Sequence, residues 1–269
     1  MAIFISTNMY HADEFPQVLD YVNAFDRQVG VEVFPLFHDP RFYGILEGCL
    51  PDLKGLDLSM HGPYYQAEHS AAPGSEAYER TMNLCRQTEH FTHLLPFHHV
   101  VYHHNNCRVH PGEEEGLRAV SCANYEEVRR MFAADLTPVL VENVGVADRG
   151  NVLFNQEEFT RLCREKQYPV LIDIGHAHAN GWDLLRLMED LKDQILAYHL
   201  HNNDGVHDSH QRIHNGSLDF DRFLDLRNDL AVRTGIDTDL VLEYAHDVIP
   251  DRRGIEEDIR FVLERAHTG

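Results

Sequence analysis

The chain has 269 residues and a net charge of −21, from 44 acidic and 23 basic side chains. This length allows one large core and is usual for an α/β barrel. The acidic charge argues against a nucleic acid partner, because a polyanion is repelled unless a basic patch overcomes the field, and the basic residues form only short pairs such as Arg129-Arg130.

Other features of the composition indicate the cellular setting. The five cysteines are scattered without a Cys-x-x-Cys pair, no secretory signal opens the chain, and no apolar run is long enough to span a membrane. We therefore expect a cytoplasmic protein that acts on a small-molecule substrate, with no nucleic acid or membrane partner, while the oligomeric state stays open. The 20 histidines are the one unusual feature, and several lie beside apolar runs.

Short apolar, β-branched runs alternate with amphipathic stretches along the whole chain. The runs predict strands at 2–8, 31–35, 56–61, 99–103, 138–142, 169–173, 195–199 and 240–243. The stretches between them predict helices at 14–28, 41–50, 75–95, 124–134, 157–166, 182–193, 218–232 and 254–265, the second being the most weakly indicated. Strands that alternate with helices imply parallel pairing through right-handed crossovers. Eight such units without a linker predict a single (β/α)8 TIM barrel over residues 1–269.

Residues able to bind a metal ion stand where six consecutive predicted strands end. They are His61, His103 with His104, Glu142, Asp173 with His176, His199 with Asp208 and His210, and Glu243. In a TIM barrel these strand ends form the catalytic face. Imidazole and carboxylate are ligands of zinc and manganese, and a lone carboxylate is costly to bury at the end of an apolar strand. Each residue alone could be an ordinary hydrogen-bonded rim residue, but together they predict a metal site.

Several of these strand ends lie in motifs that resemble those of a known family. The motifs are HGPY at 61–64, VVYH at 100–103, VEN at 141–143, DIGHAHANG at 173–181, YHLHNNDGVHDSH at 198–210 and LVLEY at 240–244. They are similar to motifs of the xylose isomerase-like TIM barrels, which include endonuclease IV (AP endonuclease family 2) and sugar phosphate isomerases and epimerases. The resemblance covers most of the barrel and implies the same fold.

The resemblance also implies metal ligands. Many members share a site whose ligands match Glu142, Asp173, His199 and Glu243 here. Members similar to endonuclease IV bind three zinc ions, and their further ligands match His61, His103, His176, Asp208 and His210. A slip of one residue in strand register would exchange His103 for His104. The implied cofactor is therefore one to three divalent ions, Zn²⁺ or Mn²⁺. The chain departs from many relatives after His210, where Gln211 to Ser217 replace a Gly-x-Gly turn.

The preferred functional hypothesis is hydrolysis of a phosphoester in a small phosphorylated sugar or nucleotide-like substrate at a multinuclear, zinc-type site. Clustered cations would lower the pKa of a water molecule and neutralise charge on phosphate oxygens. Glu142 would bridge two cations, Asp173 would orient the water, and His176 would hold the cation at the leaving group. Arg212 would clamp the phosphate, unless it is a solvated loop residue.

The alternative hypothesis is a single-metal sugar isomerase or epimerase. Glu142 and Glu243 would then move a proton as base and acid, so Glu142, Glu243 and His176 are the predicted catalytic residues across the two hypotheses. Glu32 and His178 are further candidates for substrate binding. The alternative leaves Asp208 without a required role, which is why we prefer hydrolysis. A non-catalytic metal- or sugar-binding barrel is disfavoured, because several catalytic-type positions would be idle.

Overall fold

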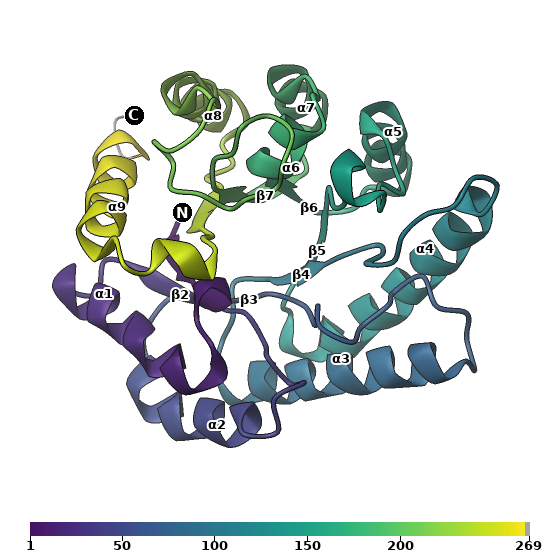
Figure 1. Cartoon of the computed structure of the whole chain (residues 1–269), viewed down its shortest axis with the longest axis horizontal. Helices are drawn as coiled ribbons and strands as arrows, with labels where there is room; N and C mark the ends of the chain where they lie inside the picture. The colour runs from purple at the N-terminus through teal and green to yellow at the C-terminus, as the bar shows by residue number, and fades with distance from the viewer. Residues whose placement is uncertain (267–269) are drawn as a thin grey trace.

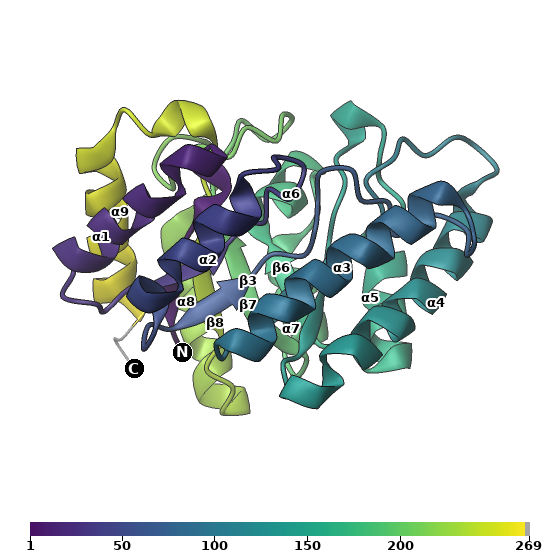
Figure 2. The same cartoon turned by 90° about the horizontal axis from the view of Figure 1, so that it is seen from below.

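Eight parallel strands close into a barrel in the computed structural model, which describes residues 1–266 (Figures 1 and 2). The strands are β1 (Ile3–Ser6), β2 (Gly30–Val33), β3 (Leu58–Met60), β4 (Val100–Tyr102), β5 (Val139–Glu142), β6 (Val170–Asp173), β7 (Ile195–Leu200) and β8 (Asp239–Leu242). Each strand pairs with the next, and β8 pairs back onto β1 with Val241 opposite Phe4. The predicted (β/α)8 TIM barrel is confirmed, and residues 267–269 lie outside the described part.

Helices surround the barrel on its outer side (Figure 1). They are α1 (Val18–Ala24), α2 (Phe42–Leu53), α3 (Glu76–Leu94), α4 (Glu114–Met131), α5 (Gln156–Lys166), α6 (Ile174–Ala179), α7 (Leu184–Leu191), α8 (Phe220–Thr234) and α9 (Arg252–Ala266). Short 3-10 turns are η1 (Thr7–Met9), η2 (Ala12–Gln17), η3 (Phe132–Asp135), η4 (Ala147–Arg149) and η5 (His246–Val248). Within residues 1–266, no helix combines the length and apolar character needed to cross a membrane.

Three helical segments differ from the sequence prediction. The predicted helix at 14–28 divides into the 3-10 turn η2 and the shorter helix α1, which ends at Ala24. The helix α4 begins at Glu114 rather than at Asn124, because Glu114 and Glu115 in its first turn interact favourably with the helix dipole. The short helix α6 was not predicted. It begins directly after Asp173, whose carboxylate accepts the backbone N–H of His176 at 2.6 Å. This cap fixes the backbone that carries His176.

Side-chain alternation along the strands separates an apolar barrel interior from the helix-facing core. Leu140 contacts Val101 and Leu171 inside the barrel, whereas Val139 and Val141 join the core under the helices. Because successive residues point to opposite faces, the residue two positions after an interior one also faces inward. The interior positions Val101, Leu140, Leu171, Ala197 and Val241 are thus followed by His103, Glu142, Asp173, His199 and Glu243. The apolar interior therefore ends in a layer of ionisable side chains at one mouth of the barrel.

Candidate metal centre

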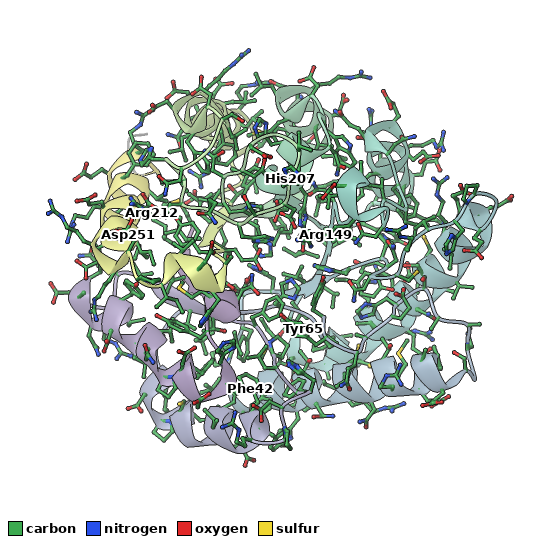
Figure 3. The ribbon with its side chains drawn as sticks, viewed as in Figure 1. Phe42, Tyr65, Arg149, His207, Arg212 and Asp251 are labelled. Carbon is green, nitrogen blue, oxygen red and sulfur yellow. The ribbon has the colours of Figure 1, made fainter. Side chains whose placement is uncertain are left out.

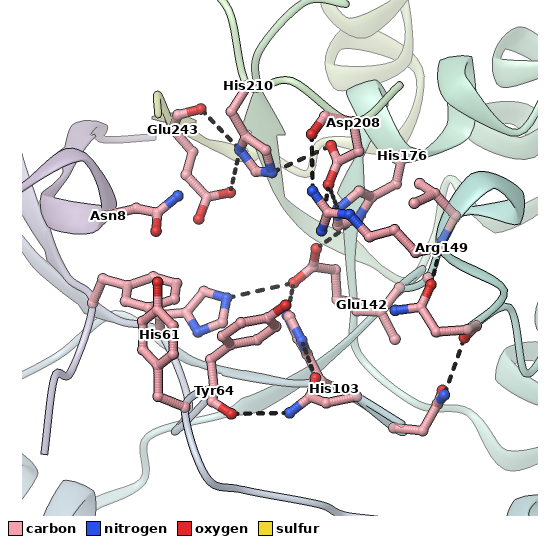
Figure 4. A pocket seen from close by; sticks show the side chains of 18 residues that line it. Asn8, His61, Tyr64, His103, Glu142, Arg149, His176, Asp208, His210 and Glu243 are labelled. Carbon is pink, nitrogen blue, oxygen red and sulfur yellow. Dashed lines mark hydrogen bonds and ion pairs between the residues drawn. The ribbon is translucent and has the colours of Figure 1, made fainter. Parts of the chain in front are cut away.

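A cavity of about 310 Å³ opens at this mouth (Figure 4). Seven of the nine predicted ligand residues line it, namely His61, His103, Glu142, His176, Asp208, His210 and Glu243. The other two, Asp173 and His199, lie at its base and are fully buried. The structure therefore brings all nine side chains together from β3 to β8 and the loops that follow them.

The first group, here called the central cluster, consists of Glu142, Asp173, His199 and Glu243. The Nδ1 atom of His199 lies 3.2 Å from Glu243 Oε2, 3.7 Å from Glu142 Oε1 and 3.8 Å from Asp173 Oδ2. On the other side of the ring, Nε2 lies 3.2 Å from Glu32 Oε2. If Nε2 carries the proton and donates it to Glu32, the Nδ1 lone pair faces three carboxylates. Ligand atoms of Asp173, His199 and Glu243 lie within 4.8 Å of one another, as the ligands of one shared cation would.

The second group, the His61 cluster, consists of His61, His103 and Glu142. The Nε2 atoms of His103 and His61 lie 2.8 Å and 3.9 Å from Glu142 Oε2. The Nδ1 atom of His61 lies 2.7 Å from the carbonyl oxygen of Gly62, to which it can donate, so Nε2 is left to face the cavity.

The strand alternation also distinguishes His103 from His104. The His104 side chain points to the helix side of β4, where its Nδ1 lies 2.8 Å from Ser121 Oγ and its ring packs edge-on against Phe154. His103 is therefore the residue that faces the cavity, and the ambiguity between the two neighbours is removed.

The third group, the Asp208 cluster, consists of His176, His201, Asp208 and His210. The carboxylate of Asp208 is 3.4 Å from His176 Nε2 and 3.3 Å from His210 Nε2. His201 stacks on His210 with ring centroids 3.8 Å apart, and its Nε2 is 3.0 Å from an Asp173 carboxylate oxygen. The backbone of His210 has φ of 44°, in the left-handed region that non-glycine residues seldom adopt, and such strain is characteristic of functional sites.

The spacing of ligand atoms in the central and Asp208 clusters fits divalent cations. Ligand atoms at about 2.0–2.2 Å from a tetrahedral zinc ion lie about 3.4 Å from one another, and the imidazole–carboxylate pairs of the central and Asp208 clusters lie 3.2 to 3.8 Å apart. Among the described residues, His176 Nδ1, His199 Nδ1 and both carboxylate oxygens of Asp208 are buried without a hydrogen-bond partner. Buried polar atoms are rarely left in this state, because each then carries its full desolvation cost. Bound cations would satisfy all four atoms.

The pKa values express the same electrostatic situation in the metal-free chain. Burial alone would raise the pKa of Glu142, but the charges of His103 and His199 lower it well below its ordinary value. Burial raises the pKa of Glu243 to about 7 against the opposing charge of His199. Burial disfavours the protonated form of His210, yet the neighbouring Asp208 raises its pKa to about 9. Without cations, protons on the imidazoles are what compensate the buried carboxylates.

Two of the residues predicted to bind substrate do not reach the cavity. Glu32 is fully buried between His199 and Ser59, with its carboxylate 3.4 Å from Ser59 Oγ. It supports the ring of His199 and cannot touch a substrate directly. His178 lies on α6 and turns to the loop after β7, where its Nε2 is 2.8 Å from Ser217 Oγ. The structure therefore does not support a substrate-binding role for either residue.

The predicted phosphate clamp, Arg212, is also placed elsewhere. Its guanidinium donates two hydrogen bonds of 2.9 Å to Asp258 and pairs with Asp251. Figure 3 shows Arg212 beside Asp251 at α9, away from Arg149 and Tyr65 at the centre of the face. The two carboxylates neutralise the guanidinium and tie the loop after β7 to α9. The structure therefore does not place Arg212 where it could bind a phosphate in this cavity.

Sequence reasoning missed two residues of the site. His201 follows His199 by two positions, so the alternation of β7 directs both rings inward, and this signal was present in the sequence. Arg149 comes from η4 in the loop after β5 and lines the cavity beside Asp208. No periodicity or motif distinguishes Arg149 from any other loop arginine.

Comparison with known proteins identifies the family. The family model described as xylose isomerase-like TIM barrel matches residues 51–265, whereas no curated protein sequence matches the chain. A D-tagatose 3-epimerase-like protein is 17% identical, with a TM-score of 0.74 over 98% of this chain and 99% of that chain. The IOLI protein with a bound zinc atom is 12% identical, with a TM-score of 0.77 over 99% of this chain and 98% of its own.

A third structure, the family 2 AP endonuclease from Brucella melitensis, is 15% identical, with a TM-score of 0.70 over 98% of this chain and 99% of that chain. Other similar structures are described as epimerases, among them a D-psicose 3-epimerase and a D-allulose 3-epimerase. Identities this low show the fold alone. The family model, in contrast, covers more than half of the sequence, and the chain therefore belongs to the xylose isomerase-like TIM-barrel family.

Proposed function

We propose that this protein is a metal-dependent hydrolase that cleaves a phosphoester of a small phosphorylated sugar or nucleotide-like molecule. The Asp208 cluster is the observation that carries the proposal. A single-metal sugar isomerase needs only the central cluster, to which Asp208 does not belong. The Asp208 side chain is nevertheless completely buried, and the imidazoles of His176 and His210 and the half-exposed guanidinium of Arg149 face it at 3.2 to 3.4 Å. Imidazole and carboxylate groups gathered in this way are the ligands that a zinc ion takes.

Different residues of the site would bind the cations and the substrate. Divalent cations would lower the pKa of a water molecule and neutralise the charge that develops on phosphate oxygens. Glu142 belongs to two clusters, because its Oε2 faces His103 while its Oε1 lies 3.7 Å from His199 Nδ1. Its two oxygens would therefore hold cations in both clusters. Asp173 is held in place because its backbone N–H and C=O both bond to the side chain of Asn143, at 2.7 Å and 2.9 Å.

Another part of the cavity lining suits an organic group. It includes the aromatic side chains of Phe34, Tyr64 and Tyr65 and the amide of Asn8. Aromatic surface can pack against a sugar or base ring while the amide bonds to its polar atoms. The cavity of about 310 Å³ and the net charge of −21 both favour a small substrate over duplex DNA.

A sugar isomerase or epimerase is the second candidate. The epimerases among the similar structures support this reaction more than hydrolysis. The central cluster is compatible with it, because Glu142 and Glu243 flank His199 Nδ1 at 3.7 Å and 3.2 Å and could act as base and acid. It assigns no function to the Asp208 cluster, and for that reason we place it second.

One experiment separates the two candidates. The metal content of protein purified without added metal is measured, and the metal-replete enzyme is then assayed against a panel of sugar phosphates and small phosphodiesters and against pairs of interconverting ketoses. We expect two or three equivalents of metal and release of phosphate or of an alcohol. About one equivalent, together with ketose interconversion and no release from any ester, would establish the isomerase instead.

A further inference from the structure

We propose that Arg149 is the anion-binding residue of this site. In the metal-free chain it holds Asp208, and it turns to a phosphate oxygen of the substrate when cations occupy the Asp208 cluster. The inference rests on the proposed phosphoester hydrolysis and adds both the group that recognises the phosphate and the kind of ester that fits.

The contacts of Arg149 place its charge at the cavity. Its Nη1 lies 3.2 Å from Asp208 Oδ2, and its Nη2 donates to the backbone carbonyl of Asp208 at 3.0 Å. Its side chain is 49% exposed, whereas the Asp208 side chain is fully buried. Figure 4 shows the guanidinium of Arg149 reaching across to Asp208 at the edge of the cavity. Among residues 1–266, Arg149 is the only lysine or arginine that lines this cavity.

The loop around Arg149 is fixed, so only the side chain is free to move. Gly150 has a left-handed φ of 67°, and its carbonyl accepts the N–H of Val109 at 2.9 Å. Asn180 binds the loop twice, accepting from Ala147 N at 2.9 Å and donating to the carbonyl of Gly145 at 2.8 Å. A fixed backbone lowers the entropic cost of binding an anion with the arginine it carries.

Occupation of the Asp208 cluster changes what Arg149 can bind. Cation binding by the Asp208 oxygens would leave Nη1 of Arg149 without its carboxylate partner. Arg149 would then keep its bond to the backbone carbonyl of Asp208 and present the remaining N–H groups to the cavity. A planar guanidinium with several N–H donors matches the spacing of phosphate oxygens. Because Glu142 and Glu243 also line the cavity, a phosphate there needs a cationic side chain of this kind.

The position of Arg149 also indicates the class of ester. A second cavity, of about 630 Å³, shares Asn8, Tyr65, Arg149, Asp208 and His210 with the first. Arg149 thus lies where the two cavities meet. A phosphate bound at this junction has room for one organic group on each side, so the geometry points to a small phosphodiester rather than a monoester.

The test compares two replacements of Arg149 with a matched control. Arg149→Gln removes the charge, and Arg149→Lys keeps it without the planar donors. Arg186→Gln is the control, because Arg186 is a 61% exposed arginine on α7 that pairs with Asp190 at 3.5 Å, on the outside of the barrel. The first readout is calorimetric binding of inorganic phosphate to zinc-loaded protein. We expect R149Q to bind phosphate at least about ten-fold more weakly than wild type, R149K to be intermediate, and R186Q to match wild type.

The second readout is zinc binding to metal-free protein, which does not depend on activity. Because Arg149 competes with a cation for Asp208, R149Q should bind its weakest zinc ion more tightly than wild type. Equal phosphate affinity in R149Q and wild type, no phosphate binding by wild type, or weaker zinc binding by R149Q would each overturn the inference. The proposed function fails separately, if zinc-loaded wild type binds phosphate through Arg149 yet cleaves no phosphoester.

Discussion

Replacing Asp208 by asparagine tests whether the third cluster is a ligand set. The change keeps the shape of the side chain and removes the charge that faces His176 and His210 at 3.4 Å and 3.3 Å. Loss of a residue that merely supports a metal ligand costs about 10–100-fold in metal affinity. Loss of a charged, fully buried ligand should therefore cost at least about 100-fold, or about 2.7 kcal/mol. We expect one metal equivalent to be lost and phosphoester hydrolysis to fall by a similar factor.

The assay is metal content after dialysis, together with the rate of hydrolysis of a chromogenic phosphodiester. Asp204→Asn is the matched control, because Asp204 lies in the same loop, is 59% exposed and pairs with His207 at 2.7 Å. The control should keep wild-type metal content and rate. If D208N also keeps them, or if it interconverts ketoses as fast as wild type with one metal bound, the reasoning about the Asp208 cluster is refuted.

Three further predictions concern support of the site, its pH dependence and the stability of the barrel. Glu32→Gln should lower metal affinity by about 10–100-fold while leaving the fold intact, because Glu32 orients the ring of His199 through its Nε2. Metal titration measures the affinity, and circular dichroism checks the fold. Metal affinity should rise with pH between 6 and 9, by about ten-fold per pH unit for each proton displaced. The reason is that the pKa of His210 is raised to about 9, so its proton must leave before a cation binds. A metal affinity that does not change with pH would contradict this. Asp239→Asn should lower the free energy of unfolding by about 2 kcal/mol at neutral pH, because Asp239 accepts from Ala2 N at 2.7 Å and from His98 at 2.9 Å at the far end of the barrel. Burial alone would raise the pKa of Asp239, but hydrogen bonds from His98 and His99 lower it. Asp239 in turn raises the pKa of His98. The pair therefore stabilises the fold above pH ~4 and below the raised pKa of His98, and denaturation curves of D239N and wild type should converge in acid.

The fold and most of the site could be predicted because both follow from strand alternation. An apolar strand that ends in a carboxylate or imidazole gives the position of the residue and, through the two-residue period, the direction of its side chain. The same rule, applied at strand ends, would have selected His103 over His104 and would have added His201 to the site.

Other features depend on contacts between distant segments. Arg212 lies two residues after His210 in the sequence, but Asp251 and Asp258 on the α9 side hold it elsewhere. Arg149 reaches the cavity only because Asn180 and Val109 fix the loop that carries it. Neither arrangement leaves a periodic or local signal, since each is decided by partners that tertiary packing brings together.

The most direct test of the central claim is an anomalous-difference map from crystals of the zinc-loaded protein. The account predicts a peak within the central cluster, bounded by Glu142, Asp173, His199 and Glu243, and further peaks within the His61 and Asp208 clusters. A single peak in the central cluster would contradict the multinuclear site. The absence of any peak among these four side chains would contradict the claim that they converge on a cation.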